Sequence, residues 1–276
     1  MISLLVMAGA ILSLAVTFYL YRKSNTEYLA LAQAARMTDE IPPELPAEDA
    51  AEPKEAPDEA GETEEQSAPE EPAAVPIPIN FSYLESVNED IIAWIEVEGT
   101  TVDFPILYDE STTMFYLNHN HVRAYTPYGS IFMLSENKPD FRDFNSLVYG
   151  HNIVDGSMFG VLHDFEDPDF FKENKTILVY TPDRVLQYRI FAAYRTDNLN
   201  QIQNFDYETP EGRQAYIDRI YTHDVRANFD PDVSVSPDDR ILTLSTCIAN
   251  AAYRYLVQGV LISELPGIPS DYEAEE

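Results

Sequence analysis

The single cysteine of this 276-residue chain, Cys247, ends an apolar segment with strand character, Ile241–Cys247. His151 ends a second such segment far upstream, and Arg254 follows the cysteine closely. A thiolate nucleophile needs a group that manages its proton and a cation that stabilises a developing oxyanion. These three residues could fill those roles, so the sequence predicts acyl transfer through a cysteine nucleophile.

The alternation of side chains before the cysteine favours a reactive thiol. One face of this segment is small and polar and consists of Thr243, Ser245 and Cys247, because successive strand residues point to opposite faces. Such a face is typical of a groove floor rather than a core layer. A buried structural cysteine is the alternative, since unpaired cysteines often pack as small apolar residues.

The N-terminal segment Met1–Tyr21 has no charged side chain and is long enough to cross a bilayer. Because no cleavage site of small residues follows closely, we expect an uncleaved transmembrane anchor, with a cleaved secretory signal as the alternative. Arg22 and Lys23, taken alone, would keep the downstream end in the cytosol. We nevertheless expect an exported domain, because the stalk and domain described next suit that side better.

The formal net charge of −31 excludes a basic surface for nucleic acid. Between residues 39 and 71, fourteen Asp and Glu face Lys54 alone and alternate with prolines. This composition predicts a disordered, extended spacer. We therefore expect an anchor at 1–21, a stalk at 22–79 that is acidic and Pro-rich from about 38, a folded domain at 80–268 and an acidic tail at 269–276.

Strand signals dominate the folded part and predict a mainly β domain, an eight-stranded, closed or nearly closed antiparallel barrel. The expected strands are 93–97, 102–106, 130–134, 146–149, 176–180, 185–196, 240–246 and 253–263. Pro182 and Asp183 predict a tight turn. Short helices are expected at 83–91, 158–165 and 169–174, and a helix capped by Thr209 in the long insertion 199–237.

Four motifs resemble the sortases, the cysteine transpeptidases of Gram-positive cell surfaces, and most closely class B. They are His-Asn-Ile-Val-Asp-Gly-Ser-Met-Phe-Gly at 151–160, Thr-Leu-Ser-Thr-Cys at 243–247, Asp-Ile-Ile-Ala-Trp-Ile-Glu-Val at 90–97 and Gly-Ser-Ile-Phe-Met at 129–133. The resemblance covers roughly residues 87–262. It implies an eight-stranded β-barrel in which the insertion before the cysteine strand forms one wall of the substrate groove.

The resemblance also implies residue roles. Cys247 is the expected nucleophile, His151 the acid and base, and Arg254 the residue that holds the oxyanion and positions substrate. The expected substrate-binding residues are Tyr149, Ser245, Thr246 and Leu117. Only six residues separate Cys247 from Arg254, a shorter turn than in many relatives.

The implied activity is cleavage of a C-terminal sorting signal, formation of a thioester on Cys247, and transfer to an amine on a peptidoglycan precursor. The expected location is the outer face of a Gram-positive-type cell membrane. A pilin polymerase, a cysteine peptidase and a non-catalytic adhesin are the alternatives. No cofactor is expected, and His119 and His121 lack the further ligands that a metal site needs.

Overall fold

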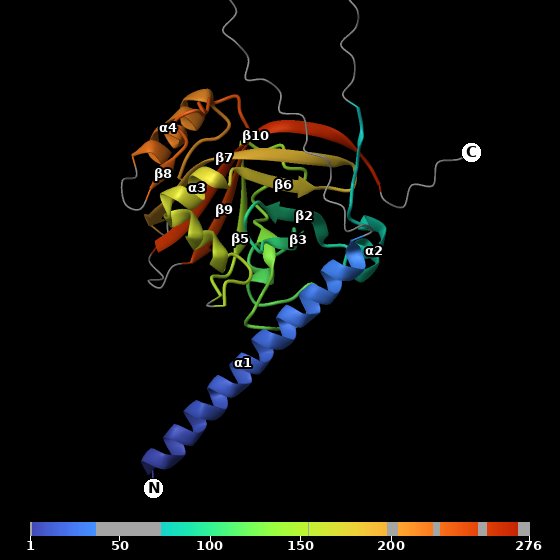
Figure 1. The fold of residues 1–276 in the computed structure, drawn as a ribbon, viewed down its shortest axis with the longest axis vertical. Helices are drawn as coiled ribbons and strands as arrows, with labels where there is room; N and C mark the ends of the chain where they lie inside the picture. Colours follow the sequence, from blue (N-terminus) through green and yellow to red (C-terminus); the bar gives the residue numbers. More distant parts are fainter. Residues whose placement is uncertain are drawn as a thin grey trace, which may run out of the picture.

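A closed β-barrel lies at the centre of this protein (Figure 1). The computed structural model describes residues 2–36, 73–153, 155–197, 204–222, 227–247 and 253–269; for residues 2–14 and for Cys247 it describes the backbone alone. The barrel strands are β2 (Ile91–Val97), β3 (Asp103–Leu107), β4 (Ile131–Met133), β5 (Asn145–Gly150), β6 (Thr176–Tyr180), β7 (Arg184–Asp197), β9 (Ile241–Cys247) and β10 (Tyr253–Ile268).

The strands pair in the order β10-β9-β5-β4-β3-β2-β6-β7, and pairing of β7 with β10 closes the barrel. The predicted eight-stranded closed barrel is therefore confirmed. The prediction that all strand pairs are antiparallel was wrong, because β3 pairs parallel with β4 and β5 pairs parallel with β9. Both parallel pairs are joined by long crossing connections, which parallel neighbours require. Short strands β1 (Val75–Pro76) and β8 (Asn228–Phe229) extend the sheet beside β10 and β7.

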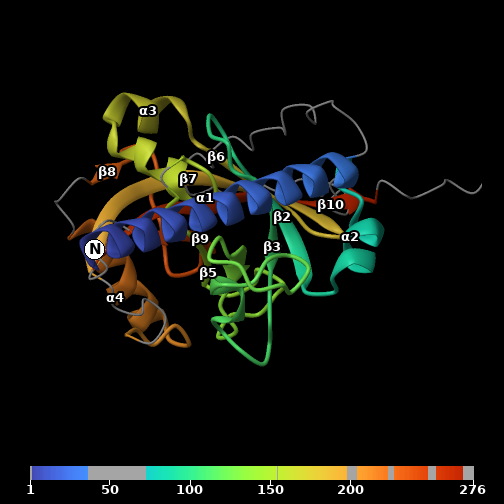
Figure 2. The same cartoon turned by 90° about the horizontal axis from the view of Figure 1, so that it is seen from below.

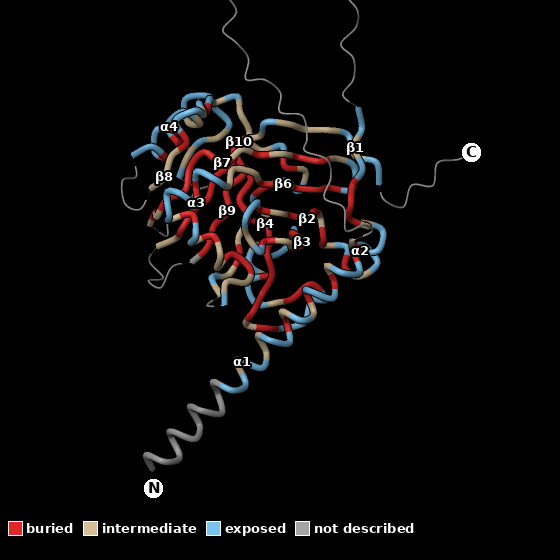
Figure 3. The backbone as a smooth tube through the Cα atoms, in the orientation of Figure 1, coloured by how far each residue is buried: buried red, intermediate tan, exposed pale blue. Residues whose placement is uncertain are grey.

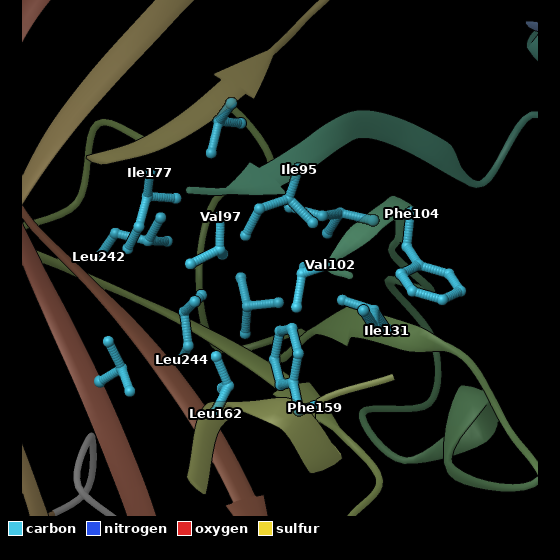
Figure 4. Packing of buried hydrophobic residues seen from close by; sticks show 14 of the residues in the cluster. Ile95, Val97, Val102, Phe104, Ile131, Phe159, Leu162, Ile177, Leu242 and Leu244 are labelled. Carbon is cyan, nitrogen blue, oxygen red and sulfur yellow. The ribbon is translucent and has the colours of Figure 1, made fainter. Parts of the chain in front are cut away.

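Alternation along the strands divides the apolar side chains between two layers. Ile95 of β2 points into the barrel, where it packs with Val102, Ile131 and Leu244 in one buried cluster (Figure 4). The adjacent Trp94 belongs to a second cluster outside the barrel. In Figure 3 the central strands are mostly buried, whereas the second half of β10 is intermediate or exposed. The strand pattern of the sequence thus defines both faces of the barrel wall.

Several local predictions are confirmed within a few residues. Tyr180 pairs with Val185 across the expected turn. Helix α4 (Pro210–Tyr221) begins where expected, and the Thr209 hydroxyl accepts a hydrogen bond from the Gly212 N–H at 3.2 Å. The shorter helices are α2 (Phe81–Val87), the 3₁₀ helices η1 (Phe115–Leu117) and η2 (Gly160–Glu166), and α3 (Pro168–Glu173). The helix expected at 83–91 is shorter, because Ile91 already pairs with Leu107 in the sheet.

The N-terminal helix α1 (Ile2–Ala35) continues well past the predicted anchor, and its C-terminal part lies against the barrel (Figures 1 and 2). Ser24, Tyr28, Leu31 and Ala35 recur at helical spacing and are buried. Residues 22–36, assigned to the stalk from composition, therefore pack on the barrel. The helical spacing of these buried residues is a sequence pattern from which the packing of α1 on the barrel could have been predicted.

The two ends of the acidic segment meet at one place on the barrel. Arg36 and Ile79 form an antiparallel bridge, and the Asn80 N–H donates to the Ala35 carbonyl at 2.8 Å. The segment consequently does not separate α1 from the barrel. Residues 37–72 of the predicted stalk, and residues 270–276 of the predicted tail, lie outside the described residues.

The predicted anchor Met1–Tyr21 falls in the first part of α1, mostly where side chains lie outside the described set. Among the residues that the structure describes, no helix is long and apolar enough to span a membrane.

Candidate active site

Three neighbouring strands bring the predicted catalytic residues to one end of the barrel. Cys247 of β9 lies directly opposite Arg254 of β10 in an antiparallel pair. On the other side of β9, Thr246 pairs with Gly150 of β5, and His151 follows Gly150. The backbone therefore places the three residues at the same level on adjacent strands, although they are far apart in the sequence.

The imidazole of His151 is held by a main-chain group. Its Nε2 lies 2.6 Å from the carbonyl oxygen of Leu117, at the end of η1. Because a carbonyl oxygen can only accept, Nε2 carries the proton in this arrangement. Nδ1 then remains as the ring nitrogen that can take up or release a proton. The main chain of His151 is fixed as well, since its carbonyl accepts from the Phe159 N–H at 3.0 Å.

Arg254 is half-buried between β9 and β7. Its backbone pairs with Cys247 on one side and with Thr196 on the other. Its Nη1 donates to the carbonyl oxygen of Tyr253 at 3.0 Å. A guanidinium in this position presents several donors beside the backbone of the cysteine.

The residues expected to bind substrate fall into two groups. Tyr149 is half-buried and stacks on Phe132, with ring centroids 6.0 Å apart, and the Leu117 side chain is 40 % exposed. Ser245 and Thr246 are each only 1 % exposed. Thr246 shares the face of Leu244 and so points into the barrel. The structure brings all four to the neighbourhood of His151 and Cys247, but only the first two expose much side chain.

Helix α4 covers the polar face of β9 at Thr243 rather than leaving it open. Thr243 is fully buried and donates to the Asn145 Oδ1 at 2.7 Å. The Gln258 amide donates to the Thr243 hydroxyl at 2.8 Å and to the Tyr216 hydroxyl of α4 at 2.7 Å. The expectation that Thr243 lies on a groove floor was therefore wrong. Its small polar side chain instead joins a buried network that fixes α4 against β5, β9 and β10.

A second network that the sequence reasoning missed surrounds the residue after His151. The Asn152 Nδ2 lies 3.1 Å from the Nε2 of His163, and the Nδ1 of His163 lies 2.9 Å from a carboxylate oxygen of Glu166. Since the carboxylate accepts from Nδ1, Nε2 accepts from the Asn152 amide. The His163 ring also stacks on Tyr255, with centroids 5.0 Å apart. The position of His163, four residues after Phe159 in a 3₁₀ turn, gave no sequence signal for this contact.

The two histidines weighed as metal ligands have other contacts. His119 Nδ1 lies 2.8 Å from the Phe115 carbonyl oxygen, and the ring stacks on Phe115. His121 is buried against Tyr28, and burial lowers its pKa. Within the described ranges, no group of three or more His, Cys, Asp and Glu could hold a metal ion.

Comparison with known proteins identifies the same family throughout. A family model described as "Sortase domain" matches residues 95–262. Sortase B of Staphylococcus aureus (strain NCTC 8325 / PS 47) is 34 % identical over 167 residues, which cover 60 % of this chain and 67 % of the relative. Sortase B of Listeria monocytogenes serovar 1/2a is 33 % identical over 186 residues, covering 66 % of this chain and 73 % of the relative.

Solved structures show the same similarity. A Staphylococcus aureus sortase B–substrate complex is 33 % identical, with a TM-score of 0.60, over 66 % of this chain and 84 % of that chain. A Clostridium perfringens sortase B has a TM-score of 0.61 and 30 % identity, over 66 % of this chain and all of that chain.

Proposed function

Because the chain belongs to the sortase family of cysteine transpeptidases, we propose that it cleaves the C-terminal sorting signal of secreted proteins and transfers the acyl group to an amine of the cell wall. The observation that supports this most is the strand register. It sets Cys247 opposite Arg254, and it sets Thr246 opposite Gly150, the residue before His151. This arrangement supports the roles of nucleophile, cation and proton donor for three residues at one end of the barrel.

In the proposed reaction, the Cys247 thiolate attacks a backbone carbonyl carbon of the sorting peptide. The carbonyl oxygen becomes an oxyanion, which the Arg254 guanidinium stabilises. As the tetrahedral intermediate collapses, the C–N bond breaks and protonated His151 gives its proton to the leaving amine. The remaining thioester is attacked by an acceptor amine, whose proton passes to His151 as the thiolate leaves. No step requires a cofactor.

The contacts of His151 support different tasks for its two nitrogens. Nε2 is bonded to the Leu117 carbonyl, so the proton exchanged with substrate is carried by Nδ1. Leu117 thus contributes through its main chain as well as through an exposed side chain. We propose that the side chains of Leu117 and Tyr149 contact the sorting peptide, whereas Ser245 and Thr246 act through the backbone and packing of β9, because both are buried.

We also propose that Met1–Tyr21 anchors the chain in the membrane, with the barrel on the outer face of a Gram-positive-type cell. The uncharged, apolar composition of this segment supports the proposal. Fractionation of cells that express the full chain tests it. We expect detergent, but not high salt, to release the chain from the membrane. Protease added outside intact protoplasts should digest the barrel, and a barrel protected from that protease would contradict the proposal.

The activity is tested with the full chain, a library of candidate sorting peptides and triglycine as acceptor, with products identified by mass spectrometry. Conjugates of peptide and triglycine are expected. Hydrolysed peptide alone, with and without triglycine, would indicate a cysteine peptidase. In a parallel reaction that offers a pilin subunit as acceptor, conjugation only to a lysine of that subunit would indicate a pilin polymerase. An unreactive thiol with no product would indicate an adhesin.

A further inference from the structure

The second half of α1 contacts the segment of chain that surrounds the His151 ring. The Tyr28 ring is 2 % exposed and packs against Phe104, His121 and Tyr128. Burial raises the pKa of its phenol, which stays protonated and can donate. The helix thus inserts one aromatic side chain, with a polar tip, into the barrel side that carries η1 and β4.

The Tyr28 hydroxyl reaches the main chain just before β4. It lies 3.2 Å from the carbonyl oxygen of Gly129 and 2.6 Å from the hydroxyl of Ser130. The Ser130 hydroxyl in turn donates to the His119 carbonyl at 2.7 Å. Since that proton is used, the Tyr28 hydroxyl is the donor, and its single proton is shared between the Ser130 hydroxyl and the more distant Gly129 carbonyl. One phenol therefore fixes two consecutive residues of this segment.

Gly129 lies directly against the catalytic imidazole. Its φ of +60° favours glycine, and a Cβ there would lie 2.5 Å from the Leu117 carbonyl oxygen. The same Cβ would lie 2.9 Å from the Cδ2 of His151 and 3.0 Å from its Nε2. The backbone of Gly129 is thus a wall for the ring and for the carbonyl that holds it. A shift of Gly129 by a few tenths of an ångström would be transmitted to both.

We propose that Tyr28 of the N-terminal helix is a positioning residue for His151, acting through Gly129 and Ser130. This inference rests on the proposed function only in that His151 carries the proton in acyl transfer. It makes α1 part of the catalytic unit, because the helix fixes the wall that sets the hydrogen bond between His151 Nε2 and Leu117.

The test compares Tyr28→Phe with Ser24→Ala in the full chain. Tyr28→Phe keeps the ring packing and removes only the hydroxyl. Ser24→Ala removes another buried hydroxyl bond between α1 and the barrel, the one to the Thr126 hydroxyl at 2.9 Å. Ser24 itself contacts neither Gly129 nor Ser130, and the Gly129 N–H donates to the main-chain carbonyl of Thr126, which this variant keeps. We expect kcat to fall about 3- to 10-fold in Tyr28→Phe, as the loss of one hydrogen bond suggests. KM should hardly change, and Ser24→Ala should keep wild-type kcat.

A spectroscopic readout separates positioning from general destabilisation and does not require activity. The ¹⁵N resonances of the His151 ring, assigned by their loss in His151→Gln, report which nitrogen is protonated and hydrogen-bonded. Tyr28→Phe should shift the Nε2 resonance or broaden it, and Ser24→Ala should not. An unchanged His151 spectrum and kcat in Tyr28→Phe would overturn the inference, as would equal effects in both variants. Absence of transfer in the wild type would instead count against the proposed function.

A matched pair of glycine variants tests the wall itself. Gly129→Ala places a methyl group against His151 and Leu117, and we expect kcat to fall by ~100-fold or more because the ring is displaced. Gly156 also has a positive φ, +82°, but a Cβ there meets nothing within 4 Å. Gly156→Ala therefore carries comparable backbone strain without the contact, and should stay within about twofold of wild type on the same reasoning. Similar losses in both variants would contradict a specific role for Gly129.

Discussion

Cys247 and Arg254 are direct partners across the antiparallel pair of β9 and β10. Only six residues separate them in the sequence. Directly opposite positions in such a pair lie closer together than any diagonal neighbours. The short turn noted in the sequence is therefore compatible with an arginine held beside the nucleophile.

Replacing Cys247 by Ala is expected to abolish acyl transfer and leave the fold intact. The thiol is the proposed nucleophile, and no other cysteine is present to replace it. Mass spectrometry of the product, together with the urea midpoint of the variant, checks both parts. Residual conjugate would contradict the role of Cys247, and an unfolded variant would support the alternative of a buried structural cysteine.

Arg254→Lys is expected to lose most activity although it keeps the charge. A guanidinium offers several donors in a fixed plane, whereas an ammonium is a compact point charge. Loss of one oxyanion donor typically lowers turnover about 100- to 1,000-fold. Steady-state kcat of Arg254→Lys and Arg254→Ala measures this. Both variants should still react with a small thiosulfonate reagent, which needs no oxyanion stabilisation, and near-full transfer by Arg254→Lys would mean that charge alone matters.

The folded unit is expected to begin within α1 rather than at residue 80. A fragment that starts at residue 80 loses Tyr28 and Leu31, which occupy the two core layers of the barrel wall. Burial of such side chains contributes about 1.5–3 kcal/mol each, so the free energy of unfolding should fall by ~3 kcal/mol or more. Urea denaturation of this fragment and of one starting at Ala15 makes the comparison.

The matched control for this truncation is deletion of residues 39–71, which retains Arg36 and Ile79. Because those two residues already meet, the deletion should leave the urea midpoint almost unchanged. Equal stability of the fragments starting at residues 80 and 15 would show that α1 adds nothing to the fold.

A charge cluster on β10 makes stability depend on pH. Partial burial of Glu264 by itself raises the carboxyl pKa, but hydrogen bonds from Arg240 and Arg184 outweigh it, and the pKa lies below its usual value. A folded-state pKa below the unfolded one stabilises the protein above the unfolded pKa. That contribution is lost as pH falls through the folded pKa. Glu264→Gln should thus lower the urea midpoint at pH 7 and narrow its gap to wild type at about pH 3. A gap of the same size at both pH values would contradict this.

The sequence alone predicted the barrel and the residues that we propose to react. Alternation along segments such as Thr176–Tyr180 specifies a strand with one face in the core, and the bounds found in the structure agree with those expected. The motifs around His151 and Cys247 predicted a nucleophile and a proton carrier because only certain residue types can do that chemistry. Both are properties of local sequence, so they can be recognised without knowing which strands are neighbours.

Only the tertiary structure decided what surrounds those residues. The carbonyl of Leu117 that holds His151, the wall formed by Gly129 and the phenol of Tyr28 come from distant segments brought together by folding. Main-chain groups carry no sequence signature, so the first two contacts could not have been predicted. The contact of Tyr28 did have a signal in the sequence, the helical spacing of Ser24, Tyr28, Leu31 and Ala35. The acidic, Pro-rich composition that follows masked that signal. An apolar face at helical spacing predicts that one side of a helix is buried, and only the folded barrel determines which residues cover that side.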